Sequence, residues 1–301
     1  MSKRDFLSLL DCSPEELRAL LARGSELKRS LHEGEPYRPL VGCTAALMLL
    51  LNSTRTRVAF EAGMNQLGGQ AIFLGAADTQ LGRGEPVTDT AKVLSEMVDI
   101  AIIRTQNHAD VESFAGAASI PVVNAMTNRF HPCQLLADMQ TYEELRGSVE
   151  GSTVAFLGDG YNMCQSYINA ARQYGFCLKI ACPPGFEPEA GLLAGSNDTT
   201  LTEAPREAVE NADLVVTDVW SSIGHDEERE KRRNAFAPYQ VNEDLLDYAK
   251  DDVLFLHCLP AHRGEEVNET VLDDPRSGAW TAAGNRLHSQ KALLEFLLVE
   301  R

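Results

Sequence analysis

The stretch TAALMLLLNSTRTRVAFEAGMNQLGG, residues 44–69, joins a short apolar run to an amphipathic segment. Residues 44–51 are nearly all apolar, which is typical of a strand that helices cover on both faces. After Ser53 the apolar residues recur at helical spacing until Gly68-Gly69 interrupts the pattern. A buried strand followed directly by a helix predicts one unit of a parallel α/β sheet.

The same alternation continues along the rest of the chain. Strand-like apolar runs lie at residues 44–51, 71–74, 100–103, 121–123, 153–157, 178–182, 214–219 and 253–256. Helical patterns separate most of them, which favours parallel sheets over hairpins. We therefore expect an α/β protein with two doubly wound parallel-sheet domains, whose ligands bind at the carboxyl ends of the strands.

Chain length and three helical patterns set the expected domain organisation. At 301 residues the chain can form two compact domains, each with its own core, and we expect a cleft between them. Ser13, Pro14 and Glu16 have the spacing of a helix start. The pattern at residues 131–147 predicts a helix that connects the two domains. A last pattern, at about residues 285–299, predicts a final helix that packs back on the first domain.

Composition narrows the classes of partner. Acidic residues outnumber basic ones by 44 to 27, so the formal charge is −17, which argues against nucleic acid or an acidic membrane as a partner. The longest apolar run is too short to span a bilayer, and acids interrupt the N-terminus where a signal peptide is apolar, so we expect a cytoplasmic protein. The seven cysteines are odd in number and form no C-x-x-C pair, so they suggest neither a disulfide framework nor a zinc site.

A phosphate site is predicted at the helix that follows the first buried strand. Ser53-Thr54-Arg55-Thr56-Arg57 concentrates hydroxyl and guanidinium groups at the N-terminus of that helix. Free backbone N–H groups and the positive end of the helix dipole would add to them. The alternative interpretation is an ordinary capped helix with exposed arginines, because serine and threonine are common N-caps.

Two further segments place polar side chains where a ligand edge is expected. Arg104 directly follows a predicted strand, at the carboxyl end where ligands bind in this fold class. His131-Pro132-Cys133-Gln134 opens the connecting helix and places an imidazole and a carboxamide in the expected cleft. Taken one at a time these signals are weak, because most arginines are solvated and a lone histidine is more often structural than catalytic.

The second half offers candidate residues for a small substrate. Gly158-Asp159-Gly160 lacks the third glycine of the dinucleotide fingerprint, so we expect no nicotinamide cofactor. Asp218 ends a strand and is followed by serines, a set that suits an amino-acid substrate. The charged run at residues 226–233 predicts a solvated, mobile loop.

A cysteine in this half is a possible nucleophile. Cys258 follows the strand at residues 253–256, and His257 or His131 is its possible base. Adjacent residues on a strand point to opposite faces, so His257 is poorly placed to serve Cys258.

Taken in order, the motifs resemble the ornithine carbamoyltransferase family of the aspartate/ornithine carbamoyltransferase superfamily. They are STRTR at residues 53–57, QLGRGEP at 80–86, HPCQLLAD at 131–138, GDGYNM at 158–163, DVWSSIG at 218–224, HCLP at 257–260 and NRLHSQKALL at 285–294. The resemblance covers essentially the whole chain. The DVWSSIG segment is the one that separates ornithine from aspartate enzymes.

The resemblance implies a carbamoyl transfer from carbamoyl phosphate to L-ornithine, giving L-citrulline and phosphate. It implies a homotrimer with active sites at the subunit interfaces, and neither a metal nor an organic cofactor. Residues 1–134 plus 286–301 would form the carbamoyl phosphate-binding domain, and residues 135–285 the ornithine-binding domain.

The resemblance also implies roles for individual residues. The residues expected at carbamoyl phosphate are Ser53, Thr54, Arg55, Thr56, Arg104, His131, Pro132, Cys133, Gln134 and Arg286, with Gln80 of a neighbouring subunit. Those expected at ornithine are Asn162, Asp218, Ser222 and Ile223, and Cys258 and Leu259 line the reacting centre. Arg104, His131, Asp218 and Cys258 are the expected catalytic residues, and Arg57 is either a phosphate ligand or a structural support.

Three departures from the family pattern leave alternatives. Leu51 stands where the family usually has a lysine, Ile223 replaces a methionine and Gly284 replaces a glutamate. One alternative is a carbamoyltransferase for another acceptor, such as putrescine, a modified ornithine or aspartate. Another, motivated by Leu51, is a catalytically weak protein that binds carbamoyl phosphate.

Overall fold

The structure is a computed structural model that describes residues 3–77, 84–196, 198–220 and 229–299. The chain divides into two compact units, of which unit 1 comprises Met1–Gln140 and Gly284–Arg301, and unit 2 comprises Thr141–Ala283. Each unit contains one sheet, and every strand pair in both sheets is parallel. The predicted α/β class with two parallel sheets is therefore confirmed. Within the described residues, no helix is both long enough and apolar enough to cross a membrane.

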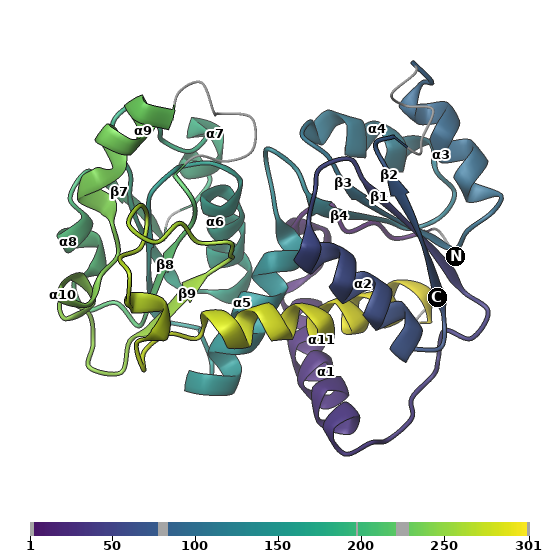
Figure 1. The fold of residues 1–301 in the computed structure, drawn as a ribbon, viewed down its shortest axis with the longest axis horizontal. Helices are drawn as coiled ribbons and strands as arrows, with labels where there is room; N and C mark the ends of the chain where they lie inside the picture. Colours follow the sequence, from purple (N-terminus) through teal and green to yellow (C-terminus); the bar gives the residue numbers. More distant parts are fainter. Residues whose placement is uncertain (1–2, 78–83, 197, 221–228, 300–301) are drawn as a thin grey trace. The chain divides into compact units, whose positions relative to one another are not determined.

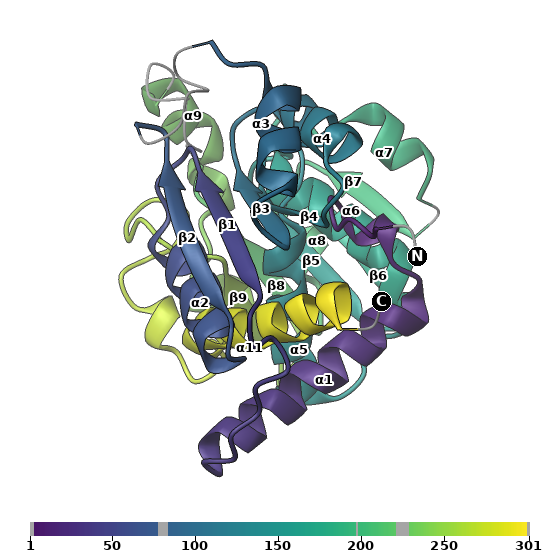
Figure 2. The same ribbon diagram turned by 90° about the vertical axis from the view of Figure 1, so that its right-hand side faces the viewer.

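Unit 1 is built on a four-stranded sheet in the order β2-β1-β3-β4 (Figures 1 and 2). Its strands are β1 (Thr44–Leu49), β2 (Gln70–Gly75), β3 (Ile100–Arg104) and β4 (Val122–Met126). The central strands β1 and β3 are buried almost throughout, as their apolar sequence predicts. All four carboxyl ends lie at one edge of the sheet, which is where the first set of predicted ligand residues begins.

Helices cover both faces of this sheet. The helices of unit 1 are α1 (Pro14–His32), α2 (Thr54–Gln66), α3 (Val87–Ser95) and α4 (His108–Ala117), with the first part of α5 and most of α11. Helices α3 and α4 pack on one face through a cluster that includes Ala91, Val111 and Phe114. On the other face α2 contacts α11, where Gly63 faces Lys291. The start of α1 has the predicted capping box, because the Ser13 side chain accepts from the N–H of Glu16.

Unit 2 is built on a five-stranded sheet in the order β7-β6-β5-β8-β9. Its strands are β5 (Thr153–Leu157), β6 (Cys177–Ala181), β7 (Thr199–Thr202), β8 (Leu214–Thr217) and β9 (Leu254–His257). Its helices are α6 (Asn162–Tyr174), α7 (Ala190–Ala194), α8 (Pro205–Val209), α9 (Arg229–Phe236) and α10 (Glu243–Leu246). Figure 1 shows α8 and α10 on one side of the sheet and α6 on the other. This arrangement buries both faces of β5, β8 and β9.

Two helices run through the boundaries between the units. Helix α5 (Pro132–Arg146) lies where the connecting helix was predicted. Helix α11 (Ala279–Leu298) begins earlier than the predicted start near Asn285. Asn285 is fully buried inside the helix, and its side-chain oxygen accepts a hydrogen bond from Lys28 Nζ at 2.9 Å. An asparagine that suggests a cap in the sequence is therefore an interior residue that ties α11 to α1.

Two local predictions are corrected by the structure. Strand β7 was not predicted, because it lies at the edge of the sheet, has only one large apolar residue and is nowhere fully buried. The charged run at residues 226–233 was predicted to be a solvated loop, but its described part, from Arg229 onward, belongs to helix α9. Arg232 in that helix is only 4% exposed.

Candidate active site

The predicted phosphate segment lies at the N-terminus of α2, directly after β1. Ser53 is the N-cap of this helix, and its Oγ accepts a hydrogen bond from the N–H of Thr56 at 3.2 Å. The capped-helix interpretation is therefore right for Ser53. It does not exclude a ligand, because the first N–H groups of any helix lack intrahelical partners and the helix dipole favours an anion at this end.

The two arginines of this segment have different surroundings. Arg57 Nε lies 2.9 Å from Glu61 Oε1, and its guanidinium stacks 3.8 Å from the centre of the Phe73 ring. Both contacts hold it on the outer side of α2 and β2, as a structural support. The positive charge of Arg55 instead contributes to lowering the pKa of the buried His131 imidazole.

A buried network of polar side chains joins α2, α5 and α11. Arg286 Nη1 donates to Gln134 Oε1 at 2.6 Å, and Arg286 Nη2 donates to Thr56 Oγ1 at 3.3 Å. Gln134 Nε2 in turn donates to Asp138 Oδ1 at 2.9 Å. When the Gln290 carboxamide is turned so that its oxygen faces Arg286, it also accepts from that guanidinium. All five side chains are at most 2% exposed, so the network fixes the positions of Arg286, Gln134 and Thr56.

Three arginines surround one buried histidine in unit 1. His131 is 6% exposed, and burial lowers the pKa of its imidazole well below the ordinary value. The charges of Arg286, Arg104 and Arg55 lower the same pKa further. The imidazole is therefore neutral near pH 7 and offers one N–H donor and one acceptor nitrogen. In a chain of net charge −17, these three guanidinium groups form a local positive cluster of the kind that can bind a phosphate.

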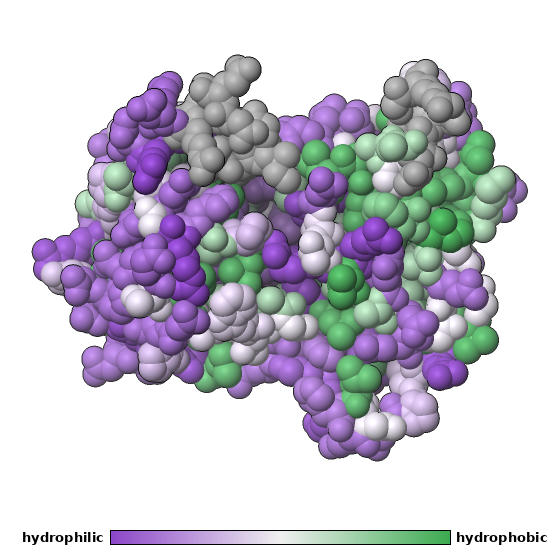
Figure 3. Space-filling view, viewed as in Figure 1, coloured by the Kyte–Doolittle hydropathy of each residue, from purple (hydrophilic) through white to green (hydrophobic). Residues whose placement is uncertain are grey.

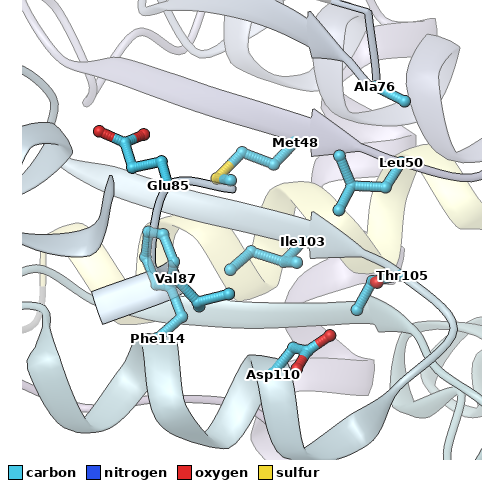
Figure 4. A pocket seen from close by; sticks show the side chains of 9 residues that line it. All are labelled: Met48, Leu50, Ala76, Glu85, Val87, Ile103, Thr105, Asp110 and Phe114. Atoms are coloured by element: carbon cyan, nitrogen blue, oxygen red, sulfur yellow. The ribbon is translucent and has the colours of Figure 1, made fainter. Parts of the chain in front are cut away.

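Arg104 owes its direction to the alternation along β3. Ile103 and Thr105, the residues on either side of it, line a cavity of about 320 Å³ on the face that carries α3 and α4. Figure 4 shows the apolar side chains that line this cavity, together with Glu85 and Asp110. Two carboxylates and an apolar wall do not suit a phosphate dianion. Arg104 is 8% exposed and points to the opposite face.

The cysteine of the HPCQ segment has a structural role. Cys133 is fully buried, and its thiol donates to the backbone oxygen of Asn124 at 3.4 Å. Burial raises the pKa of this thiol to about 12, so it stays protonated at neutral pH. Pro132 begins α5, where the absence of an N–H is harmless.

The candidate residues of unit 2 lie at the carboxyl ends of three neighbouring strands. Asn162 begins α6, shortly after β5, and is 4% exposed. Asp218 follows β8, and Cys258 follows β9. Because β8 lies between β5 and β9 in the sheet, parallel pairing brings the three residues to one edge.

Asp218 and Cys258 are direct neighbours. The thiol of Cys258 donates to Asp218 Oδ1 at 2.8 Å, and the same oxygen accepts from the N–H of Val219 at 2.7 Å. Burial raises the pKa of Asp218, while His257 and the Cys258 hydrogen bond oppose that rise. Both ring nitrogens of His257 face groups other than the Cys258 thiol, because Nδ1 accepts from the N–H of Leu259 at 2.8 Å and Nε2 lies 3.3 Å from Glu266 Oε1. The expectation that His257 does not serve Cys258 as a base agrees with this geometry.

Two backbone features shape the same edge. Leu259 has a φ of 55°, a left-handed conformation that is costly for a residue with a side chain and that recurs at functional sites. Gly160 packs against the backbone at residues 186–188, where an added Cβ would lie 2.2 Å from Pro188 N. The Gly158-Asp159-Gly160 turn therefore needs its second glycine for packing within unit 2, which accounts for that glycine without a dinucleotide.

Some buried residues that hold the candidate site residues in place were not predicted from the sequence. Arg232 Nε donates to the backbone oxygen of Trp220 at 2.6 Å, and its guanidinium pairs with the buried Asp159. Because the neighbouring residues in α9 are charged, the sequence did not indicate that Arg232 is buried. In unit 1 the missed residues are Asp138 and Gln290, each four positions after a predicted ligand on the same helix. Residues four positions apart are neighbours on one face of a helix, so this spacing could have identified both residues.

Gln80, Ser222 and Ile223, which were predicted as substrate-binding residues, lie outside the described residues.

Comparisons with known proteins identify the family of the chain. The chain belongs to the aspartate/ornithine carbamoyltransferase family, with the carbamoyl-P binding domain matched at residues 4–144 and the Asp/Orn binding domain at residues 150–297. It is therefore an enzyme, a carbamoyl-transferring transferase, as the sequence predicted.

Individual relatives are similar over the full chain. An ornithine carbamoyltransferase from Chromohalobacter salexigens is 56% identical over 301 residues, which cover 99% of each chain. An anabolic ornithine carbamoyltransferase from Pseudomonas aeruginosa is 57% identical over 99% of this chain and 98% of its own. The solved ornithine carbamoyltransferase from Pyrococcus furiosus has a TM-score of 0.95 and 43% identity, over 100% of this chain and 98% of that one.

Proposed function

We propose that this chain transfers the carbamoyl group of carbamoyl phosphate to the side-chain amine of L-ornithine, giving L-citrulline and phosphate. Residues 1–134 plus 286–301 form the carbamoyl phosphate-binding domain in this proposal, and residues 135–285 the ornithine-binding domain. The observation that carries the choice of acceptor is the Asp218 carboxylate beside Cys258 at the ligand edge of unit 2. The anabolic relative supports a role in arginine biosynthesis.

The phosphate is assigned to the N-terminus of α2 and the arginine next to it. Ser53 and Thr54 contribute hydroxyl groups and backbone N–H groups, and Arg55 contributes a forked pair of donors. Arg286 adds positive charge from α11, where Gln134 and Thr56 hold its guanidinium. Pro132 and Cys133 complete the wall at the start of α5. The preorganised charges stabilise the departing phosphate without rearrangement at the moment of reaction.

The carbamoyl group is assigned to the residues that follow β3 and begin α5. Thr56, Arg104 and His131 donate to the carbonyl oxygen, on which negative charge grows as the amine attacks. Thr56 Oγ already accepts from Arg286, so its hydroxyl proton is available to donate. Gln134 Oε1 has a second lone pair for the carbamoyl NH2, and the backbone oxygen of Leu259 is its other acceptor.

The reaction needs no covalent enzyme intermediate. The ornithine nitrogen forms a bond to the carbonyl carbon, the bond from that carbon to the phosphate oxygen breaks, and the proton lost by the amine passes to the phosphate. Positioning and electrostatic stabilisation account for the rate. The amine must be neutral to attack, although its pKa resembles that of lysine, about 10.

Selection of ornithine rests on charge. The Asp218 carboxylate favours a substrate that carries an amine at this end and repels the side chain of aspartate. Asn162, buried at the start of α6, is assigned to the α-carboxylate and α-amino groups, together with Ser222 and Ile223. Cys258 keeps Asp218 oriented by its hydrogen bond.

Assembly into a homotrimer belongs to the same proposal, with Gln80 reaching the site of a neighbouring subunit. Figure 3 shows apolar side chains gathered over the β2 and α3 side of unit 1. Of the residues of β2, α3 and the turn after α3, Met97 is 71% exposed, and Ile72 and Val93 are each 49% exposed. Exposed apolar surface of this kind is typical of a protein–protein interface. We also expect the enzyme to work in the cytoplasm.

An acceptor panel tests the proposal. The purified chain is supplied with carbamoyl phosphate and, separately, with ornithine, putrescine or aspartate at matched concentrations, and both phosphate and the carbamoylated product are measured. Ornithine should give equal amounts of citrulline and phosphate and the highest kcat/KM. A higher kcat/KM with putrescine or aspartate contradicts the choice of acceptor. Binding of carbamoyl phosphate without turnover of any acceptor contradicts the catalytic role.

A further inference from the structure

A group of three possible metal ligands lies in the segment that follows β9, apart from the side chains assigned to the reaction. His262 Nδ1 lies 3.8 Å from Glu266 Oε2 and 4.0 Å from Glu265 Oε2. The nitrogen and one carboxylate oxygen from each glutamate all lie within 4.8 Å of one another. Exposed acidic groups often gather without binding an ion, so this proximity alone carries no conclusion.

A second observation, independent of this proximity, concerns the buried carboxylate of Glu266. Its side chain is fully buried, and its Oε1 accepts a hydrogen bond from the backbone N–H of His262 at 2.5 Å. Its Oε2 has no hydrogen-bond partner, although no solvent reaches it. A buried carboxylate oxygen without a partner is costly, because desolvation is not offset by any interaction. This oxygen faces the imidazole of His262, so an ion bound there would satisfy it.

The turn that carries the three residues is held in place by the core. Val267, next to Glu266, is fully buried in the hydrophobic cluster of unit 2 and forms a bridge with Val241. The N–H of Gly264 donates to the backbone oxygen of Val267 at 2.7 Å and closes the turn. The site is therefore largely preorganised, with Glu266 fixed and the half-exposed imidazole of His262 free to rotate toward it.

The donor set indicates the class of ion. One imidazole nitrogen with two carboxylate oxygens suits zinc and neighbouring divalent transition metals, whereas magnesium and calcium prefer oxygen ligands alone. Bond lengths of about 2.0–2.2 Å around a tetrahedral zinc ion place its ligand atoms roughly 3.3–3.6 Å apart. The observed 3.8 and 4.0 Å need only small side-chain rotations to close.

We propose that His262, Glu265 and Glu266 form a binding site for one divalent transition-metal ion of the zinc class. A water molecule completes the coordination on the solvent side, where His262 is exposed. Glu266 Oε1 also lies 3.3 Å from His257 Nε2, and His257 in turn accepts from the N–H of Leu259. The proposed ion therefore lies directly behind the segment that carries Cys258 and Leu259.

Zinc titration of the full chain tests the site. Isothermal titration calorimetry and the zinc-dependent rise of the thermal midpoint are measured for the wild type, His262→Asn, Glu265→Gln and Cys258→Ser. The wild type and Cys258→Ser should bind one ion per chain with similar affinity. His262→Asn and Glu265→Gln should lose at least about 10–100-fold in affinity, the loss that changes of supporting residues already cause at metal sites. The thermal midpoint of His262→Asn without zinc should stay near the wild-type value, because the His262 side chain is 44% exposed.

Cobalt absorption gives a second readout that does not depend on activity. Cobalt bound by nitrogen and oxygen should show ligand-field bands without the charge-transfer band of a thiolate ligand, and His262→Asn should abolish those bands. Three results overturn the proposal. They are zinc binding that survives His262→Asn and disappears in Cys258→Ser, a thiolate band in the cobalt spectrum, and no zinc bound by the wild type.

Discussion

The Cys258 thiol donates a hydrogen bond to Oδ1 of Asp218 across 2.8 Å. In the parallel register of β8 and β9, the last residues of the two strands, Thr217 and His257, are paired. The residues that follow them, Asp218 and Cys258, therefore lie next to each other. A thiol that donates to a carboxylate is held in its protonated form, which is the opposite of what a nucleophilic cysteine needs. The relationship therefore assigns Cys258 to the orientation of Asp218 and favours direct attack by the substrate amine.

Cys258→Ala should leave an active enzyme with a weaker ornithine site. The variant loses one hydrogen bond to a charged group, worth about 1.5–3 kcal/mol, so kcat/KM for ornithine should fall by roughly 10-fold to 200-fold. Cys258→Ser keeps a donor and should fall less. Steady-state kinetics of both variants check this. Complete loss of turnover in both, together with a carbamoylated cysteine trapped in the wild type, would show that the thiol is a nucleophile after all.

Arg104→Ala should lose affinity for carbamoyl phosphate while the chain remains folded. Removal of one member of a buried charged contact typically costs about 2–5 kcal/mol, or roughly 30-fold to several thousand-fold in Kd. Arg57→Ala is the matched control, because Arg57 pairs with the exposed Glu61 on the outer side of α2. Calorimetry should show near-normal binding in Arg57→Ala only. Equal losses in the two variants would place both arginines at the phosphate.

The proposed sharing of active sites between subunits predicts complementation between two inactive variants. Gln80→Ala lacks the group given to a neighbour, and Arg104→Ala lacks a group of its own site. When the two are unfolded, mixed equally and refolded, about a quarter of the sites in random trimers should pair an intact Arg104 with an intact Gln80. Activity should recover to about that fraction of wild type. No recovery in trimers that light scattering shows to be mixed would mean that each site is built within one chain.

Lys291 predicts a pH-dependent change in stability. It is 3% exposed in α11, and burial lowers its pKa from 10.5 to about 8. The unfolded chain keeps the ordinary value, so between these pH values it binds more protons than the folded chain, and the free energy of unfolding rises with pH. Relative to Lys291→Met, the wild type should gain about 2–3 kcal/mol across this window. Urea denaturation of both proteins at pH 7.5 and 10.5 measures it, and a constant difference contradicts the lowered pKa.

Much of the fold could be predicted because its strands are buried on both faces. Such strands are apolar runs, and β5 (Thr153–Leu157) lies at the residues predicted. The edge strand β7 has no such run, because exposed residues on an edge need not be apolar. The start of α11 was placed too late for a related reason. Asn285 suggests a helix cap, but a partner on α1 makes it an interior residue, and sequence does not show that partner.

Residues of the candidate site could be predicted where a charged side chain lies at the end of a predicted strand. Asp218 and Arg104 were found in this way. Arg232 was missed because its neighbours are charged and its partner, Asp159, is distant in the sequence. The direction of the Arg57 side chain also could not be predicted, because it depends on a contact between helix α2 and Phe73 of strand β2.

The ornithine site is tested most directly by Asp218→Asn, which keeps the shape of the side chain and removes its charge. The variant loses a hydrogen bond from a charged group, worth about 1.5–3 kcal/mol. The measurement is kcat/KM for ornithine in the variant and the wild type, with carbamoyl-phosphate affinity determined on the same samples. We predict a fall of roughly 10-fold to 200-fold in kcat/KM and an unchanged Kd for carbamoyl phosphate. Ornithine turnover that is the same in both proteins would contradict the assignment of Asp218 to the acceptor.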